Sequence, residues 1–245
     1  MRGLGEGMKL MISGAAALLM VSCAGPGGGG GSTRDAWGHR AGPRGFRTVV
    51  LDAGHGGKDS GARSGVTGAL EKELTLDMVQ RVKRELGGSF AVKMMREDDR
   101  FVDLDERAAR AAGMGDVLVS IHFNSGPSSV RGPETYYWRV DSHGLAVRMQ
   151  RGMAAVSPAE SGSRGMVRRR LRLTRNPEIP CVLIEVGYLS NPGEARLCSD
   201  AGYRQRMAKA VADAIRGQAA QGDAGTGALP PPIFAPPSRP TDAKE

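Results

Sequence analysis

Apolar and polar residues alternate along the chain in segments that predict strands and helices in turn. Short apolar runs rich in β-branched residues, bounded by Gly or polar residues, are typical of buried strands. Segments in which apolar residues recur every three or four positions are typical of helices that cover a sheet. In residues 72–86, for example, Leu74, Met78 and Val82 fall at four-residue spacing. This segment therefore predicts a helix that packs one side against a core.

Strands and helices are predicted along the whole central part of the chain. The predicted strands cover residues 48–52, 90–95, 116–122, 134–138, 171–174 and 181–186. The predicted helices cover residues 72–86, 103–114, 142–155 and 202–217. Such alternation predicts an α/β fold: one domain with a twisted, mostly parallel or mixed sheet of about six strands, flanked by helices. Sites in such sheets form beyond the carboxyl ends of the strands.

The first 23 residues have the pattern of an export signal. Lys9 precedes the run LMISGAAALLMV, which is apolar but too short to span a bilayer. The run ends in Met20-Val21-Ser22-Cys23, which resembles the bacterial lipoprotein box and predicts lipidation of Cys23. Ordinary cleavage near Cys23 is the alternative. We therefore expect an exported protein, anchored by lipid, with its domain in the periplasm; Ala24 in place of Asp after Cys23 favours the outer membrane.

Two further segments have compositions that do not favour a packed core. Residues 24–45 are dominated by Gly and predict a flexible tether. Residues 219–245 are rich in Pro and polar residues and predict a disordered tail. Residues 46–218 remain as the single predicted folded domain.

Charge and cysteine content narrow the choice of partners. Lys and Arg number 34 against 26 acidic residues, a balance that suits an anionic partner or serves solubility alone. Aromatic residues make up only 4% and no stacking module is present, which argues against nucleic acid. If Cys23 carries lipid, Cys181 and Cys198 form an even pair, and two buried thiols are favoured over a disulfide. We expect a monomer.

Two histidines and two glutamates stand at strand ends or in the loops that follow. They are His55, Glu71, His122 and Glu185. Zinc takes neutral imidazole and carboxylate ligands, and a hydrolytic zinc site keeps one position open. Taken singly, each residue also has an ordinary role; Glu71, for instance, would favour a helix dipole, and Glu73 competes with it as a ligand.

The motifs around these residues, taken together, resemble one enzyme family. They read VVLDAGHGGKDSGA, EKELTLDM, RFVDLDERAARAA, SIHFNS and VLIEVGYLSNPGEA, and they occur in this order over about residues 48–215. In sequence and order they are similar to the zinc-dependent N-acetylmuramoyl-L-alanine amidases of the amidase-3 type, which are cell-wall hydrolases. The resemblance implies one Zn²⁺ per chain, held by His55, Glu71 and His122. It implies that Glu185 is the catalytic carboxylate, which takes a proton from water and returns it to the departing nitrogen.

Other residues are weaker candidates. Asn124, just past His122, is a candidate for contact with substrate, with turn formation as the alternative. Arg168 and Arg170 are candidates for substrate binding, because stem peptides of peptidoglycan carry carboxylates that Arg binds well. A charged edge strand that prevents aggregation is an equally good interpretation of the arginine-rich segment. Asp52 is a candidate to orient His55 as a hydrogen-bond acceptor, with a structural role as the alternative.

The expected function is zinc-dependent hydrolysis of the amide bond between N-acetylmuramic acid and L-alanine in peptidoglycan. Two alternatives stay open. One is a catalytically silent lipoprotein that binds peptidoglycan, and the other is a different zinc peptidase or deacylase on the same scaffold.

Overall fold

A computed structural model describes residues 40–175 and 178–231. The helices are α1 (Glu71–Leu86), α2 (Leu104–Met114), the 3₁₀ turn η1 (Val140–Ser142), α3 (His143–Val156), α4 (Pro192–Ser199) and α5 (Ala201–Gln221). The strands are β1 (Thr48–Ala53), β2 (Ala91–Met94), β3 (Val117–Asn124), β4 (Glu134–Tyr137), β5 (Gly165–Arg168) and β6 (Cys181–Tyr188). The predicted signal peptide with its lipoprotein box lies outside the described residues, as does most of the predicted tether.

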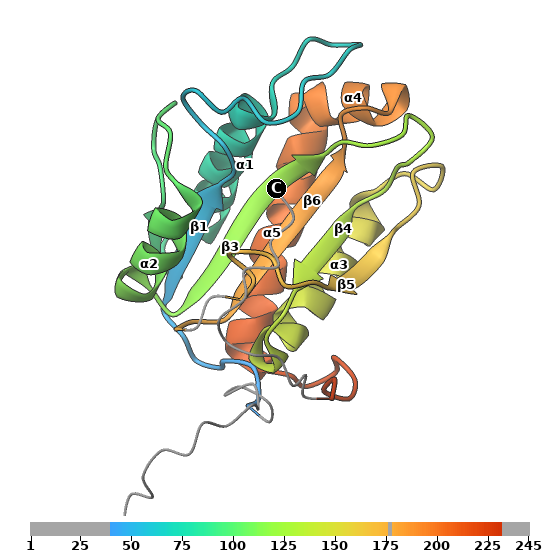
Figure 1. The fold of residues 1–245 in the computed structure, drawn as a ribbon. Helices are drawn as coiled ribbons and strands as arrows, with labels where there is room; N and C mark the ends of the chain where they lie inside the picture. Colours follow the sequence, from blue (N-terminus) through green and yellow to red (C-terminus); the bar gives the residue numbers. More distant parts are fainter. Residues whose placement is uncertain (1–39, 176–177, 232–245) are drawn as a thin grey trace, which may run out of the picture. The chain divides into compact units, whose positions relative to one another are not determined.

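The six strands form one sheet in the order β2-β1-β3-β6-β4-β5 (Figure 1). Strands β2, β1, β3 and β6 are parallel, whereas β4 runs antiparallel to β6 and parallel to β5. The prediction of a single α/β domain with a mixed sheet of about six strands is therefore confirmed for the described part of the chain.

Strand alternation separates two unequal cores. On one face, Val119, Ile121, Val182 and Ile184 are fully buried in the larger cluster, together with apolar side chains of α1, α3 and α5. On the other face, residues such as Leu118 pack with α2 in a smaller cluster. Polar residues of β3 and β6 project from this second face and line a cleft.

Within the residues that the structure describes, one predicted strand is absent, and the first predicted helix begins at a different residue. Residues 171–174 form a turn instead of a strand, because the Thr174 hydroxyl accepts a hydrogen bond from the Leu171 backbone N–H and donates one to the Arg169 carbonyl. The sheet edge is formed instead by β5. Helix α1 also begins one residue earlier than expected, at Glu71.

The last helix continues past Gly217, where the sequence pattern had predicted its end. Gln218 is fully buried and accepts a hydrogen bond from Arg148, and α5 ends at Gln221, before Gly222 with its φ of 57°. The backbone N–H of Gly42 donates to Asp223, and that of Gly45 to the Ala219 carbonyl. The packed region therefore includes residues on both sides of the predicted 46–218 boundaries.

Two further features bear on the sequence predictions. Cys181 and Cys198 are both buried free thiols, and they belong to the two different core clusters. Burial raises the pKa of Cys198, so this thiol stays protonated. Among the described residues, no helix is both long enough and apolar enough to cross a membrane.

Candidate metal centre

His55, Glu71 and His122 come from three separate elements and meet at one end of the sheet. His55 lies two residues after β1, Glu71 is the first residue of α1, and His122 is near the end of β3. One donor atom from each lies within 4.8 Å of the other two. The structure thus brings together the three residues that the sequence predicted as ligands.

The backbone after β1 turns sharply so that His55 faces this cluster. His55 has a φ of 60°, in the left-handed region that residues other than Gly seldom adopt. Its Nδ1 lies 2.8 Å from the Asp59 carboxylate, which leaves Nε2 directed at Glu71. Gly61, with a φ of 61°, passes so close that a Cβ there would lie 2.5 Å from the Glu71 carboxylate. The glycine-rich loop is therefore needed for the close approach of His55 to Glu71.

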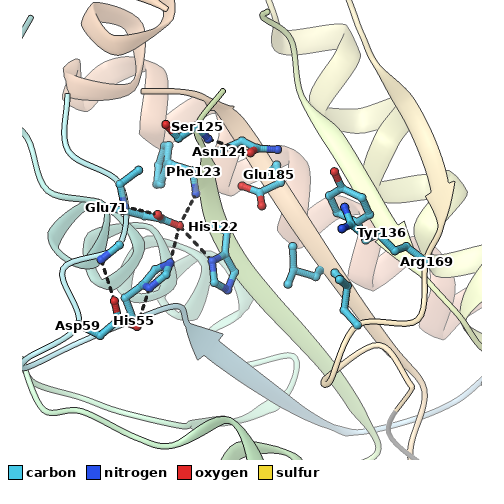
Figure 2. A pocket seen from close by; sticks show the side chains of 14 residues that line it. His55, Asp59, Glu71, His122, Phe123, Asn124, Ser125, Tyr136, Arg169 and Glu185 are labelled. Carbon is cyan, nitrogen blue, oxygen red and sulfur yellow. Dashed lines mark hydrogen bonds and ion pairs between the residues drawn. The ribbon is translucent and has the colours of Figure 1, made fainter. Parts of the chain in front are cut away.

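The Glu71 carboxylate is held by backbone donors. Its Oε2 accepts a hydrogen bond of 2.8 Å from the Ala62 N–H, and its Oε1 accepts one of 3.0 Å from the Phe123 N–H. Oε1 also lies 3.0 Å from His55 Nε2 and 3.0 Å from His122 Nδ1 (Figure 2). One oxygen of the carboxylate is thus oriented toward both imidazoles.

These distances fit a zinc-binding site. Zinc–nitrogen and zinc–oxygen bonds of about 2.0–2.1 Å at tetrahedral angles place neighbouring donor atoms about 3.3 Å apart. The two observed donor separations of 3.0 Å are close to this value. Two imidazoles and one carboxylate are also a donor set that catalytic zinc accepts. The residues present therefore fit the metal that the sequence predicted.

The electrostatics of the cluster favour a cation at its centre. Burial alone would lower the pKa of His55, but the hydrogen bonds and negative charges of Glu71 and Asp59 raise it from 6.5 to about 9. Burial would raise the pKa of Glu71, but the hydrogen bonds and charges of His122 and His55 hold it well below its ordinary value. In the metal-free protein the cluster therefore keeps a proton that a metal ion would displace.

We expect metal affinity to rise with pH because of this proton. The folded-state pKa of His55 is raised, so the stabilisation by its proton is complete below pH 6.5 and is lost as pH rises to about 9. Over the same window the zinc affinity should increase by up to about tenfold per pH unit, since one proton must leave. Calorimetric titration with zinc at pH 6.5 and 7.5 in buffers of different ionisation enthalpy measures both effects. Affinity that is the same at both pH values, with no proton released, would contradict this expectation.

Two buried arginines fix the backbone that carries His55. Arg96 donates to the carbonyls of Ala53 and Gly54, each at 2.9 Å. Arg107 donates to the carbonyl of Ala53 at 2.8 Å and to that of His55 at 2.6 Å. Both side chains are almost fully buried, so this turn has little freedom to move.

Asp59, and not Asp52, is the carboxylate that orients His55. Asp52 is fully buried, forms an ion pair with Arg107, and accepts a hydrogen bond of 2.7 Å from the Ser120 hydroxyl. The prediction for Asp52 was wrong because its side chain projects across the sheet toward β3 and α2. Asp59 contacts His55 because the backbone at His55 is in the left-handed region, and the sequence did not predict this turn. Its position four residues after the His was the available signal.

Replacing Asp59 with Asn should weaken zinc binding by about 10- to 100-fold, the usual cost of removing a hydrogen-bond partner from a metal-bound His. Asp59 is partly exposed, so the fold should be retained. Competition with a chromogenic chelator measures the Kd for zinc, and Asp98→Asn, at an exposed carboxylate in the β2–α2 loop, is the control. Equal affinities for the two variants would show that Asp59 does not support His55.

Glu185 lies beside the three predicted ligands and faces a cleft. His122 and Glu185 are paired in register on the neighbouring strands β3 and β6, so both side chains project from the same face of the sheet. They line a cleft of about 460 Å³, together with residues of the loop after β1 (Figure 2). Val182, Ile184 and Val186, the apolar neighbours of Glu185 along β6, point into the opposite core, whereas Leu183 lines the cleft with Glu185.

Of the three residues predicted to bind substrate, the structure places one at the cleft and two away from it. Asn124 lines the cleft, as expected. Arg168 and Arg170 do not line it; their guanidinium groups lie 5.6 and 6.0 Å from the centre of the Trp138 ring. Arg169, between them, lines the cleft instead, because residues at the end of β5 alternate in direction. The structure thus places Arg169 at the cleft in place of the two arginines that the sequence singled out, and substrate binding in this segment stays a prediction.

Tyr136 of β4 also lines the cleft and had not been predicted to do so. Its hydroxyl donates to the buried carboxylate of Glu134 at 2.8 Å, and the Tyr188 hydroxyl donates to the same carboxylate at 3.2 Å. Burial raises the pKa of Tyr136, and the hydrogen bond to Glu134 raises it further, to about 12. The Tyr136 side chain is therefore neutral and held in place where it lines the cleft. A Tyr in a predicted strand does not by itself indicate this role.

Comparison with known proteins places this site in context. The family profile described as N-acetylmuramoyl-L-alanine amidase matches residues 49–217. A relative from Staphylococcus epidermidis, named probable cell wall amidase LytH, is 35% identical over 172 residues, which are 69% of this chain and 57% of the relative. The chain thus spans little more than half the length of that relative.

Solved structures agree with this result. The catalytic domain of CwlV, an N-acetylmuramoyl-L-alanine amidase from Bacillus (Paenibacillus) polymyxa var. colistinus, is 38% identical with a TM-score of 0.65. The match covers 69% of this chain and 96% of that domain. An N-acetylmuramoyl-L-alanine amidase from Clostridium difficile 630 is 29% identical with a TM-score of 0.67, over 71% of this chain and 97% of that one.

Proposed function

The chain belongs to the N-acetylmuramoyl-L-alanine amidase family, and from this premise we propose that it hydrolyses the amide bond between N-acetylmuramic acid and L-alanine in peptidoglycan. One observation carries the proposal: His55, Glu71 and His122 meet beside Glu185 on the wall of a single cleft. The peptidoglycan stem peptide would lie in this cleft, with its first amide bond at Glu185.

His55, Glu71 and His122 would hold one zinc ion. When bound there, zinc would lower the pKa of water to about 7 and would polarise the substrate carbonyl. The chain's own contribution is to fix the three donors: Asp59 holds the His55 ring, and the N–H groups of Ala62 and Phe123 hold the Glu71 carboxylate. Preorganised donors of this kind need no rearrangement on binding.

Glu185 would handle the protons of the reaction. Amide hydrolysis is slow because water is a weak nucleophile and the amine is a poor leaving group. A carboxylate at the cleft wall can take the proton from the attacking water and then give it to the departing nitrogen. Glu185 lies in strand β6, paired with His122 on one side and Glu134 on the other. Its position between two hydrogen-bonded strands keeps it at a fixed distance from the ligands.

Digestion of purified peptidoglycan tests the proposal. The zinc-loaded protein should release intact peptides that begin with L-alanine, and a chelator should abolish the release; mass spectrometry of the products detects both. Peptides cut at another bond would favour a different zinc peptidase or deacylase. No product under conditions in which the protein binds peptidoglycan would favour a catalytically silent binding protein.

We also propose that the protein acts after export, as a monomer anchored by lipid on Cys23, with its domain in the periplasm and peptidoglycan as its partner. The support is the sequence of residues 1–23, which lies outside the described part of the chain. Partition of the exported protein into the detergent phase tests the anchor, since a lipid chain contributes about 0.8 kcal/mol per buried methylene.

A further inference from the structure

The cleft has a second wall, opposite the metal centre, that the reaction itself does not use. It is formed by Tyr136 of β4 and by Arg169, which directly follows β5 (Figure 2). The Arg169 guanidinium lies 5.9 Å from the centre of the Tyr136 ring. The backbone N–H of Arg169 donates to the Tyr137 carbonyl at 2.8 Å, which fixes the start of this side chain.

Arg169 differs from the arginines on either side of it. Arg168 donates to the carbonyls of Trp138 and Pro231, and both Arg168 and Arg170 lie over the Trp138 ring. Arg169 is exposed and lies over a different ring, on the cleft side. Three consecutive arginines therefore have two environments, and only the middle one can meet a molecule in the cleft.

The charge of Arg169 is not neutralised by the protein. Within residues 40–175 and 178–231, no carboxylate lies within 4.0 Å of its side chain. It is also the one Arg or Lys among the described residues that line the cleft, whose other charged groups include Asp59, Glu71 and Glu185. A guanidinium over an aromatic ring keeps its N–H edge available for bidentate binding of a carboxylate. Arg169 thus offers an anion site on the wall opposite the metal centre.

Sheet geometry gives the distance from this wall to the metal centre. His122 pairs with Glu185, and Tyr136 pairs with Leu183, so the two positions differ by two strands across and two residues along. Strand spacings of about 4.8 Å and rises of about 3.3 Å per residue then place their Cα atoms about 12 Å apart. Two extended peptide residues span about 7 Å, and the side chains from both walls fill the remainder. A group on the second residue after the cut bond therefore reaches Arg169.

We propose that Arg169, positioned over Tyr136, binds a free α-carboxylate on the second residue of the stem peptide. The inference rests on the proposed function for the identity of the peptide, and it makes amidation of that carboxylate a determinant of substrate choice. An amide in its place has no charge and offers one acceptor oxygen, in place of two, to the guanidinium fork.

Binding to a catalytically inactive protein tests this proposal. The full chain with Glu185→Ala, loaded with zinc, is titrated with N-acetylmuramoyl-L-alanyl-D-glutamine, whose α-carboxylate is free and whose side chain ends in an amide, and with the same compound amidated at the α-carboxyl as well. We expect the free acid to bind about 10- to 100-fold more tightly, as for a charge-assisted hydrogen-bonded pair. Adding Arg169→Gln should bring the two Kd values together, whereas the control Arg170→Gln should keep them apart. Thermal unfolding checks that each variant is folded.

The possible outcomes separate this inference from the proposed function. Equal Kd values for the two compounds before Arg169 is changed, or a preference that survives Arg169→Gln, would overturn the inference, whether or not the wild-type protein digests peptidoglycan. A preference that depends on Arg169 supports it. If that preference holds while the wild-type protein releases no peptide from peptidoglycan, the proposed function fails and the carboxylate site stands.

Discussion

Replacing Glu185 with alanine should leave zinc binding intact and reduce turnover by about 10²- to 10⁴-fold, the range for loss of a positioned proton-transfer group. Glu185 is not among the three residues whose donor atoms converge, so the zinc content should not change. It lies in the middle of the cleft lining, where a water attacking the substrate would be within reach (Figure 2). Metal analysis of the purified variant and the rate of peptide release from peptidoglycan measure the two quantities.

The isosteric variant Glu185→Gln is the stricter version of this experiment. It retains the shape and one hydrogen-bond acceptor but cannot take a proton at neutral pH. We expect a loss of turnover similar to that of the alanine variant, with the same zinc content. Turnover equal to that of the wild-type protein would remove Glu185 from the mechanism. Loss of zinc would instead make Glu185 a ligand.

Replacing Glu71 should abolish zinc binding and activity together, while replacing Glu73 should affect neither. The two glutamates lie in the first turn of α1 and affect its dipole in similar ways. Glu71 is buried and directed at both histidines, whereas Glu73 is exposed. Since loss of an outer hydrogen-bond partner already costs about 10- to 100-fold in metal affinity, loss of a ligand should cost more.

Glu71→Ala alone would not separate a lost ligand from a disturbed fold, because Glu71 also accepts hydrogen bonds from the N–H groups of Ala62 and Phe123. Leaving these donors unsatisfied costs about 1–3 kcal/mol each. Glu71→Gln removes the charge but keeps one acceptor oxygen, so only one of the two N–H groups loses its partner. The zinc Kd and the melting temperature should be measured for Glu71→Gln and Glu73→Gln. Tight zinc binding by the first variant, or weak binding by the second, would refute the assignment.

The sequence identified the centre of the site because each of its residues lies in a distinctive local motif. His55 follows a buried strand in a glycine-rich loop, and His122 lies near the end of another buried strand. Parallel strands place such ends at the same edge of a sheet. Their convergence with Glu71 therefore followed from the fold, once the order of strands and helices was known.

The surroundings of the site could not be predicted in the same way. Asp59 reaches His55 through a backbone turn with positive φ, which the sequence pattern does not specify. The choice of Arg169 over Arg168 and Arg170 depends on where β5 ends, and that strand has few apolar residues to mark it. Asp52 was given the wrong role because alternation in β1 directs it toward Arg107. For the three arginines, one residue of register decides which side chain faces the cleft.

The central claim is that His55, Glu71 and His122 hold the zinc ion of a hydrolase. Anomalous diffraction at the zinc edge, from crystals of the protein grown with zinc, tests it most directly. We expect one strong peak between His55 Nε2, Glu71 Oε1 and His122 Nδ1, on the cleft side and next to Glu185. A peak bound by other residues, or none at this position in zinc-loaded active protein, would contradict it.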